Sequence, residues 1–241
     1  MTDWLERTEL LIGKDAIENL KKSHVLICGL GGVGSYAAEF IARSGIGTMT
    51  IIDGDVFDPT NKNRQLPALE STIGKSKAEV LAARIRDINP DITLHVLNEF
   101  VQPERVGEIL TEYQPDYVMD CIDSITPKLT WLIACKRNKF KVISSMGAGG
   151  KMDPSKVQTR DISKVVNCKM AKHLRKRLKK ENINKGIKAV FSSEHQKEDS
   201  LKMTDGTNFK KSFYGTISYI PALFGLHAAA YVIQQLTKIE K

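Results

Sequence analysis

Short apolar runs and helical patterns alternate along the first 150 residues of this 241-residue chain. The apolar runs are typical of strands buried on both faces, and they predict strands at 24–28, 48–53, 93–97, 116–121 and 141–145. Between them the apolar spacing predicts helices near 33–44, 75–88, 103–112 and 127–138. This alternation predicts an α/β fold, a Rossmann-like, doubly wound and mostly parallel sheet with helices on both faces.

The pattern changes after residue 150, so we expect two parts, 1–150 and 151–241, the second a basic C-terminal extension. Residues 192–212 are polar enough to predict a mobile loop. Residues 217–236 are apolar and long enough to cross a bilayer, but Pro221, Gly225, His227 and two glutamines interrupt them. We therefore expect a core or dimer-interface helix there and no membrane span.

A glycine turn follows the first predicted strand. The sequence GLGGVGS places Gly29, Gly31 and Gly34 between that strand and a helix, and Asp53 ends the second strand. In this context such glycines allow a tight turn, close approach of a phosphate and close packing of helix on strand, while the acid binds a ribose. The spacing predicts a nucleotide site at the carboxyl ends of the strands.

Polar and charged residues crowd the loops at the same end of the sheet. Asn61 and Arg64 follow Asp53, Lys77 opens the next helix, and Asp123 follows the fourth strand. These residue types suit cleavage of ATP, because cations and donors stabilise phosphates and an acid holds magnesium. Alternatively, Asn61 is a turn residue, Lys77 a solvated lysine and Asp123 a helix N-cap.

Charge is unevenly distributed. The chain carries a net charge of +8, whereas residues 151–191 alone hold thirteen Lys and Arg against three acids, so the remainder is close to neutral. The simplest alternative is a solvated helix face, but the concentration of charge on one segment favours a polyanion such as nucleic acid.

Five motifs in this order carry a family resemblance: GLGGVGS, IIDGD, TNKNRQ, IGKSK and DCIDS. Together they resemble the adenylating domain of the ThiF/MoeB/HesA superfamily, which includes ubiquitin-activating enzymes and bacterial activators of sulfur-carrier proteins. The resemblance covers roughly residues 7–150. It implies attack of a carboxylate on the α-phosphate of ATP, giving an acyl adenylate and pyrophosphate.

The resemblance also implies roles for individual residues. Arg7 resembles the family's N-terminal arginine, which reaches the ATP of a partner subunit in a homodimer. Asp53 would bind the ribose, and Asp123 would bind magnesium. The implied nucleotide-binding set is Gly29, Gly31, Gly32, Gly34, Asp53, Asn61, Arg64, Lys77, Asp123 and Ser124, and the implied catalytic set is Arg7, Asn61, Arg64, Lys77 and Asp123.

Further motifs extend the resemblance over nearly the whole chain. The glycines at 45 and 47, the basic run KMAKHLRKRLKK, the sequence VFSSE and the sequence GTISYIPALFGL are similar to the branch of tRNA threonylcarbamoyladenosine dehydratases. The implied substrate is a tRNA adenosine whose N6 carries a threonylcarbamoyl group with a free carboxylate. The implied tRNA contacts are Lys169, Lys172, Arg175, Lys176, Arg177, Lys179 and Lys180.

The four cysteines bear on the alternatives. None forms a C-x-x-C pair, so a zinc ribbon is not expected, and Cys28, Cys121 and Cys135 are expected in the core. Cys168 lies in the basic segment, where lysines could activate it, but an incidental cysteine is the preferred interpretation. Ring closure within the modification needs no acyl acceptor on the enzyme, since an intramolecular attack has a high effective molarity.

Three other functions remain open from sequence. The first is adenylation of the C-terminal glycine of a ubiquitin-like sulfur-carrier protein, and a sulfur-transfer protein is then a further partner to test. The second is a nicotinamide dehydrogenase, which leaves the cluster of Asn, Arg and Lys without a purpose. The third is an RNA-binding module without catalysis.

The N-terminus lacks the basic and apolar regions of a signal peptide, which predicts a cytoplasmic location.

Overall fold

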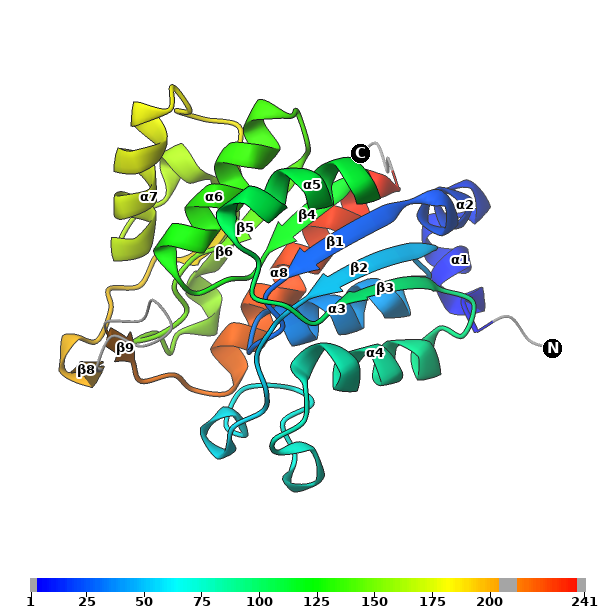
Figure 1. The fold of residues 1–241 in the computed structure, drawn as a ribbon, viewed down its shortest axis with the longest axis horizontal. Coiled ribbons are helices and arrows are strands. Elements are labelled where there is room, and N and C mark those ends of the chain that lie inside the picture. The colour runs from blue at the N-terminus through cyan, green and yellow to red at the C-terminus, as the bar shows by residue number, and fades with distance from the viewer. Residues whose placement is uncertain (1–3, 204–211, 238–241) are drawn as a thin grey trace.

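A seven-stranded sheet forms the centre of the computed structural model, which describes residues 4–203 and 212–237 (Figure 1). Its strand order is β3-β2-β1-β4-β5-β7-β6, and every neighbouring pair is parallel except β6 with β7. The strands are β1 (His24–Cys28), β2 (Thr48–Ile52), β3 (Thr93–Leu97), β4 (Tyr117–Asp120), β5 (Val142–Ser145), β6 (Val157–Asp161) and β7 (Lys188–Ser192).

Helices cover both faces of this sheet, as the alternating pattern predicts. One face packs against α3 (Gly34–Arg43), α4 (Lys77–Ile88) and α8 (Tyr219–Leu236), and the other against α5 (Pro103–Tyr113), α6 (Ile125–Arg137) and α7 (Lys169–Lys180). Strands β1, β2, β4 and β5 are almost wholly buried, so apolar residues occupy both of their faces, and polar side chains such as Asp120 and Ser144 occur at their carboxyl ends. The prediction of a doubly wound, mostly parallel sheet is confirmed.

Two short helices precede the sheet, α1 (Glu6–Ile12) and α2 (Lys14–Lys22), and they lie at the end of the sheet where the strands begin (Figure 1). The apolar stripe of α2 is buried through Ala16, Ile17 and Leu20. The periodic pattern identified neither helix in advance. Their position matters for Arg7, because α1 is far from the strand ends at which the nucleotide site is predicted.

The last helix, α8, packs on α3 rather than standing apart. Gly225 approaches α3 so closely that an added Cβ would lie 2.5 Å from the Val33 carbonyl oxygen. Ile220, Phe224 and Val232 are fully buried in the same core. The helix is part of the core in this chain, one of the two roles predicted for it. No helix in the described ranges has both the length and the apolarity needed to cross a membrane.

The second half of the chain joins the same sheet. Strands β6 and β7 extend the sheet beyond β5, and the polar segment that follows β7 holds a second, two-stranded sheet of β8 (Leu201–Met203) and β9 (Ser212–Tyr214). The predicted mobile loop at 192–212 therefore contains ordered backbone at both of its ends, and residues 204–211 lie outside the described residues.

Candidate functional site

A pocket of about 800 Å³ opens at the carboxyl ends of β1, β2, β4 and β5. The strand order reverses between β1 and β4, and this is the place where open α/β sheets bind ligands. Most residues of the predicted nucleotide-binding set line it: Gly29, Gly31, Gly32, Asp53, Asn61, Arg64, Lys77, Asp123 and Ser124. Segments as far apart in sequence as Cys28 and Pro221 thus meet at one site.

The glycine turn has the geometry of a phosphate-binding loop. Gly29 has a φ of 85°, and its N–H donates to the Ile52 carbonyl oxygen at 2.9 Å. An added Cβ on Gly34 would lie 1.7 Å from the Gly29 carbonyl oxygen, so only glycine allows α3 to begin there. Gly34 does not line the pocket, and its role is to allow this tight turn. The free N–H groups at the start of α3 favour an anion.

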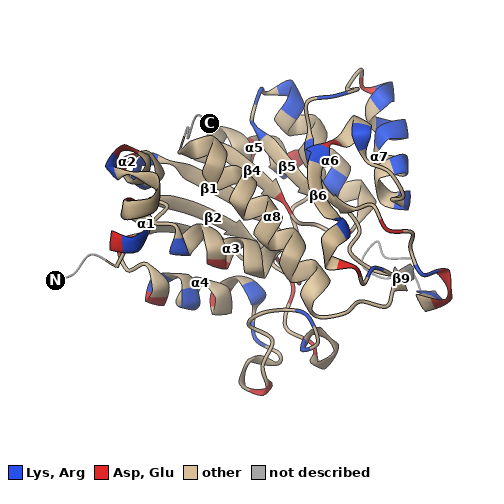
Figure 2. Ribbon diagram, turned by 180° about the vertical axis from the view of Figure 1, so that it is seen from behind, with Lys and Arg blue, Asp and Glu red and all other residues tan. Residues whose placement is uncertain are grey.

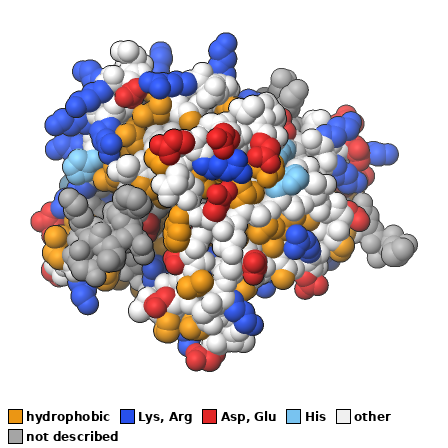
Figure 3. Space-filling model, in the orientation of Figure 1, with side chains coloured by type: hydrophobic (Ala, Val, Ile, Leu, Met, Phe, Trp, Pro, Cys, Tyr) orange, Lys and Arg blue, Asp and Glu red, His pale blue; other side chains and the backbone are white. Residues whose placement is uncertain are grey.

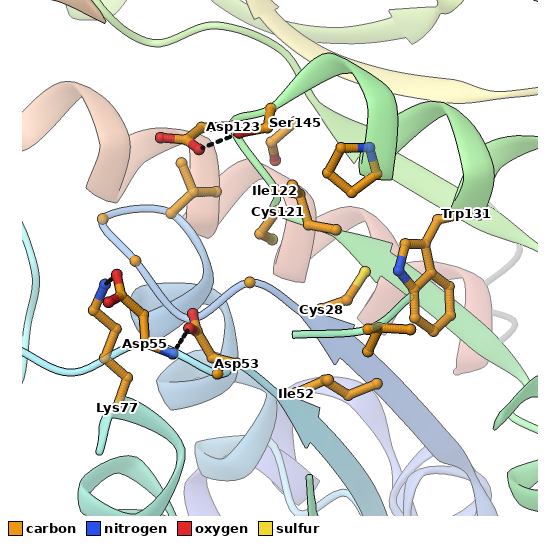
Figure 4. Close-up of a pocket in the computed structure, with 18 of the residues that line it drawn as sticks. Cys28, Ile52, Asp53, Asp55, Lys77, Cys121, Ile122, Asp123, Trp131 and Ser145 are labelled. Carbon is orange, nitrogen blue, oxygen red and sulfur yellow. Dashed lines mark hydrogen bonds and ion pairs between the residues drawn. The ribbon is translucent and has the colours of Figure 1, made fainter. Parts of the chain in front are cut away.

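Asp53 is fixed at the end of β2 by two backbone donors. Its carboxylate accepts from the N–H of Leu30 at 2.6 Å and from the N–H of Asp55 at 2.9 Å (Figure 4). The first of these bonds links the acid directly to the glycine turn. A carboxylate can accept about four hydrogen bonds, so it retains capacity for the hydroxyls of a ribose.

Lys77 is not the solvated lysine of the alternative interpretation, because its side chain is buried against the pocket. Its ammonium pairs with Asp55 at 2.5 Å, and its backbone N–H donates to the Asp55 carbonyl oxygen at 3.0 Å (Figure 4). Ser76 caps α4 through the N–H of Glu79. Asp55 is a site residue that the sequence analysis missed, although it stands two positions after Asp53 in the motif IIDGD.

The loop TNKNRQ is rigid where it faces the pocket. Asp58 caps the 3₁₀ turn Pro59–Asn61, and Asn61 is buried. The guanidinium of Arg64 donates to the carbonyl oxygen of Thr60 at 3.0 Å and to the side chain of Asn63 at 2.7 Å. Asn61 thus belongs to a turn, as the alternative holds, and also lines the pocket.

Gln65 is a second residue that the sequence analysis missed. It lines the pocket, is only 7% exposed, and its side-chain oxygen has no hydrogen-bond partner among the described residues. A buried acceptor left without a partner costs free energy, so such a group at a pocket wall indicates a ligand or water. Gln65 is the last residue of the motif TNKNRQ, next to Arg64, and this position was the available signal in the sequence.

Asp123 lies in the loop between β4 and α6. The Ser124 hydroxyl contacts the Asp123 carboxylate at 3.4 Å (Figure 4). Ser124, not Asp123, is the N-cap position of α6, so the alternative role of Asp123 as the cap of this helix is wrong. The strand β4 ends at Asp120, three residues before Asp123.

A buried ion pair supports this loop from below. The ammonium of Lys128 lies 2.6 Å from the carboxylate of Asp120, neither side chain is exposed, and Ser144 donates to the same carboxylate oxygen at 2.6 Å. The other oxygen of Asp120 accepts from the N–H of Ile122 at 3.1 Å. The pair thereby fixes the backbone that leads to Asp123, and the sequence analysis did not identify it.

Three of the cysteines are unreactive by environment. Burial raises the pKa of the thiols of Cys121 and Cys135 to about 12, with the charge of Asp120 adding to the effect, and it also raises the pKa of Cys28. Cys28 and Cys135 are buried core residues, as predicted, whereas Cys121, just after β4, is only partly buried; Cys28 and Cys121 both line the pocket. Cys168 is buried at the N-cap of α7.

The side of the pocket toward α5 and α6 carries a group of apolar side chains among uncharged polar ones. Ile52, Val106, Pro127 and Trp131 line it next to Asp53, and Figure 4 shows Trp131 beyond Cys28 and Ile52. An apolar compartment beside a polar one suits a ligand with a flat aromatic base and a charged tail.

Arg7 does not line this pocket. It belongs to α1, at the opposite end of the sheet. Within one chain the structure therefore does not bring Arg7 together with the other predicted catalytic residues, and its predicted role depends on a second subunit.

The predicted tRNA-binding residues lie on α7. Three apolar positions of this helix, Ala171, Leu174 and Leu178, are buried against the sheet, and the basic side chains gather on the outer surface (Figures 2 and 3). Lys172, Lys176, Arg177, Lys179 and Lys180 are exposed and form no ion pair within the described ranges. Arg175 instead donates to the carbonyl oxygens of Ile162 and Val165, and Lys169 pairs with Glu198 at 2.9 Å.

One lysine of the basic segment is not part of that surface. Lys151 is buried, and its ammonium donates to the carbonyl oxygens of Asn167 and Glu194. The Glu194 carboxylate accepts from the N–H groups of Met152 and Asp153, so the motif VFSSE closes a turn here. Burial lowers the pKa of Lys151. A count of Lys and Arg in the sequence of the basic segment therefore includes one charge, that of Lys151, which does not lie on its surface.

The fold and this pocket define a nucleotide-binding α/β protein of the doubly wound type. Residues 5–241 match the ThiF family, and the chain belongs to that family. The tRNA threonylcarbamoyladenosine dehydratase of Bacillus subtilis is 40% identical, and the match covers 99% of this chain and 96% of that protein.

Solved structures give the same relationship. The crystal structure of Escherichia coli tRNA N6-threonylcarbamoyladenosine dehydratase, TcdA, in complex with ATP has a TM-score of 0.87 and 36% identity, covering 97% of this chain and 93% of that one. The corresponding complex with AMP also has a TM-score of 0.87 and 36% identity, covering 99% of this chain and 96% of that one.

Proposed function

We propose that this protein is an ATP-dependent tRNA threonylcarbamoyladenosine dehydratase acting in the cytoplasm. The observation that carries the proposal is the convergence on one pocket of a glycine turn, the acids Asp53 and Asp123, and three side chains suited to phosphates, with a basic helix on the same molecule. The similarity to named dehydratases over nearly the full chain supports the same substrate.

The first step is adenylation. The threonyl carboxylate of the modified adenosine attacks the α-phosphate of ATP, and pyrophosphate leaves. Asp53 orients the ribose, while Arg64, Lys77 and Asn61 balance the charge of the phosphates, because donors fixed in advance cost no reorganisation during the reaction. The pairing of Lys77 with Asp55 holds its ammonium in place before ATP arrives.

The second step is ring closure. A nucleophilic atom of the same modification attacks the acyl carbon, AMP leaves with its bonding electrons, and the nucleophile loses its proton. The balance of both steps is loss of one water from the modification and conversion of ATP into AMP and pyrophosphate. Both reacting groups belong to one molecule, so no acceptor cysteine is required.

The pocket suits a magnesium ion bound together with ATP. Asp123 and the free side-chain oxygen of Gln65 are hard oxygen donors at the pocket wall, and magnesium is usually held by one or two carboxylates together with substrate phosphates. The described residues contain no group of three or more His, Cys, Asp or Glu side chains that could hold a metal ion. We therefore propose that the phosphates of ATP supply the other ligands of the magnesium ion. Magnesium would neutralise phosphate charge.

We also propose a homodimer in which Arg7 of one subunit completes the pocket of the other. Exposed Leu10 and Leu11 on the same helix leave an apolar surface on α1. Expected outcomes are a dimeric mass in solution and recovery of AMP formation on mixing an Arg7→Ala variant with an Asp123→Ala variant, because one of the two pockets in the mixed dimer would be intact.

A mass-spectrometric digest tests the proposed reaction. tRNA that carries threonylcarbamoyladenosine is incubated with the protein, magnesium and ATP, and AMP is followed in parallel. We expect loss of one water from the modified nucleoside together with AMP. AMP formed only with a carrier protein that ends in glycine would replace this proposal by the sulfur-carrier alternative, and intact ATP would favour a binding module.

A further inference from the structure

One wall of the pocket is uncharged, and none of its residues takes part in the proposed adenylation step. It consists of Ser145, the last residue of β5, of the next four residues up to Gly149, and of Thr216, and we call these six residues the entry strip. Figure 4 shows Ser145 near Asp123 and away from Asp53 and Lys77. The entry strip therefore borders the reaction centre on the side away from the ribose-binding acid.

The entry strip connects the pocket to the basic helix. Gly149 packs against Tyr214, since an added Cβ would lie 2.8 Å from the Tyr214 Cβ, and the Gly150 N–H donates to the Gly215 carbonyl oxygen at 2.8 Å. The Tyr214 hydroxyl in turn accepts from the ammonium of Lys169, the first residue of α7, at 3.1 Å. A continuous surface thus runs from Asp123 to the N-terminus of α7.

The Ser145 hydroxyl is a buried binding group whose neighbour is a weakly hydrogen-bonding thiol. Ser145 is only 4% exposed, lines the pocket, and its oxygen forms no hydrogen bond within the described part of the chain. The neighbouring Cys121 thiol interacts with it, but a thiol is a poor hydrogen-bonding group. The hydroxyl therefore remains able to donate to a ligand, and a buried hydroxyl left unpaired would otherwise cost free energy.

Gly147 leaves the middle of the entry strip open. An added Cβ would have no heavy atom within 4 Å, and the φ of Gly147 is not in the left-handed region. Glycine is thus not required here by the backbone. The space that it leaves belongs to the pocket.

We propose that the entry strip is the passage by which the threonylcarbamoyl arm of the tRNA reaches the α-phosphate, and that the Ser145 hydroxyl donates a hydrogen bond to an oxygen of that arm. This inference rests on the proposed function. The arm is a narrow polar chain ending in a carboxylate, which matches an uncharged passage with one donor near its inner end. ATP would bind on the side of Asp53 and Lys77, away from Ser145, so both reactants could bind at once.

A steric block at Gly147 tests the passage. Gly147→Leu fills the open space, and Gly107→Leu is the matched control, since Gly107 on α5 also has no heavy atom within 4 Å of an added Cβ and lies outside the pocket. We expect Gly147→Leu to lower cyclised tRNA by at least about 100-fold in single-turnover reactions, because a small displacement of reacting groups has effects of that size. ATP binding by calorimetry and tRNA binding by gel shift should match wild type.

Ser145→Ala tests the hydrogen bond. Loss of one donor to the arm should lower kcat/KM for tRNA by about tenfold, leaving the affinity for ATP and the unfolding free energy unchanged. Ser71→Ala, at an exposed position outside the pocket, is the control. A lower unfolding free energy in Ser145→Ala would make the hydroxyl structural and overturn its assignment.

The outcomes distinguish failure of the proposed function from failure of the proposed passage. A wild-type protein that cyclises no tRNA overturns the proposed function and this inference with it. An active wild-type protein with an equally active Gly147→Leu variant overturns the passage alone. Loss of ATP binding in Gly147→Leu also overturns it, because the strip would then belong to the nucleotide site.

Discussion

The pocket and the outer face of α7 are both rich in charge, but they hold it in opposite ways. In the pocket the charged groups are held by local partners: Lys77 pairs with Asp55, Asp53 accepts two backbone N–H groups, and Arg64 donates within the loop TNKNRQ. On α7 most basic side chains extend into solvent without ion pairs in the described ranges. Charged groups that are fixed in advance can stabilise the charge that develops in a transition state. Exposed, unpaired basic side chains can bind the many phosphates of a nucleic acid.

The largest expected effect separates chemistry from binding. Asp123→Ala and Arg64→Ala should each lower AMP formation by at least about 100-fold, because each removes a group that stabilises the reacting phosphates. Affinity for tRNA should not change, since neither residue lies on α7. AMP is measured by chromatography, and tRNA binding by gel shift.

Matched controls exist on the surface of the same chain. Asp91 and Arg86 are exposed and lie outside the pocket, so Asp91→Ala and Arg86→Ala should retain full AMP formation. Retained AMP formation in Asp123→Ala or Arg64→Ala would contradict the assigned role of that residue.

The buried pair beneath the pocket should give the next largest effect. Lys128→Met leaves the Asp120 carboxylate buried without its counter-charge and should lower the unfolding free energy by about 3–5 kcal/mol. The double variant Asp120→Asn with Lys128→Met should recover much of that loss, because no charge is then stranded. Urea unfolding measures both. Equal stability of the two variants would mean that the pair does not act as a unit.

Much of the pocket could be predicted from sequence because it depends on local motifs. Each motif contributes a turn whose geometry follows from a few residues, such as the glycine turn at Gly29, and the parallel topology brings the turns together. Asp55, Gln65 and the pair of Asp120 with Lys128 escaped prediction. Their roles depend on contacts across elements, such as Lys128 on α6 reaching the end of β4, which no spacing along the chain reveals.

The second half of the molecule was harder to predict for a different reason. The basic run of α7 was visible in the sequence. Strands β6 and β7, however, extend the sheet beyond the five strands that carry the nucleotide-binding motifs, and β8 and β9 are short, so no motif announces any of them. The burial of Lys151 shows the same limit. A lysine among lysines gives no sign in sequence that its ammonium is enclosed by the carbonyl oxygens of Asn167 and Glu194.

A moderate effect is expected on the basic face. Lys176→Ala with Arg177→Ala should weaken tRNA binding by about tenfold and reduce the dependence of log K on log salt by about 2, since two phosphate contacts are lost. ATP binding should not change. Lys14→Ala with Lys22→Ala on α2 is the charge-matched control, because both lysines are exposed at the other end of the sheet. An equal loss in the control would attribute tRNA binding to net charge rather than to α7.

The smallest expected effect concerns Lys151, a buried lysine of the basic segment whose ammonium is enclosed by backbone carbonyl oxygens. Burial lowers its pKa below the usual value of 10.5, so the unfolded chain binds this proton more tightly than the folded one does. Stability therefore rises with pH between the lowered pKa and 10.5, and below that window the enclosed charge opposes folding. Lys151→Met should remove this part of the slope of unfolding free energy against pH, whereas Lys156→Met, at an exposed position, should keep it. If both variants retain the wild-type slope in urea unfolding between neutral and alkaline pH, Lys151 titrates as a surface lysine and belongs with α7 rather than with the enclosed charges.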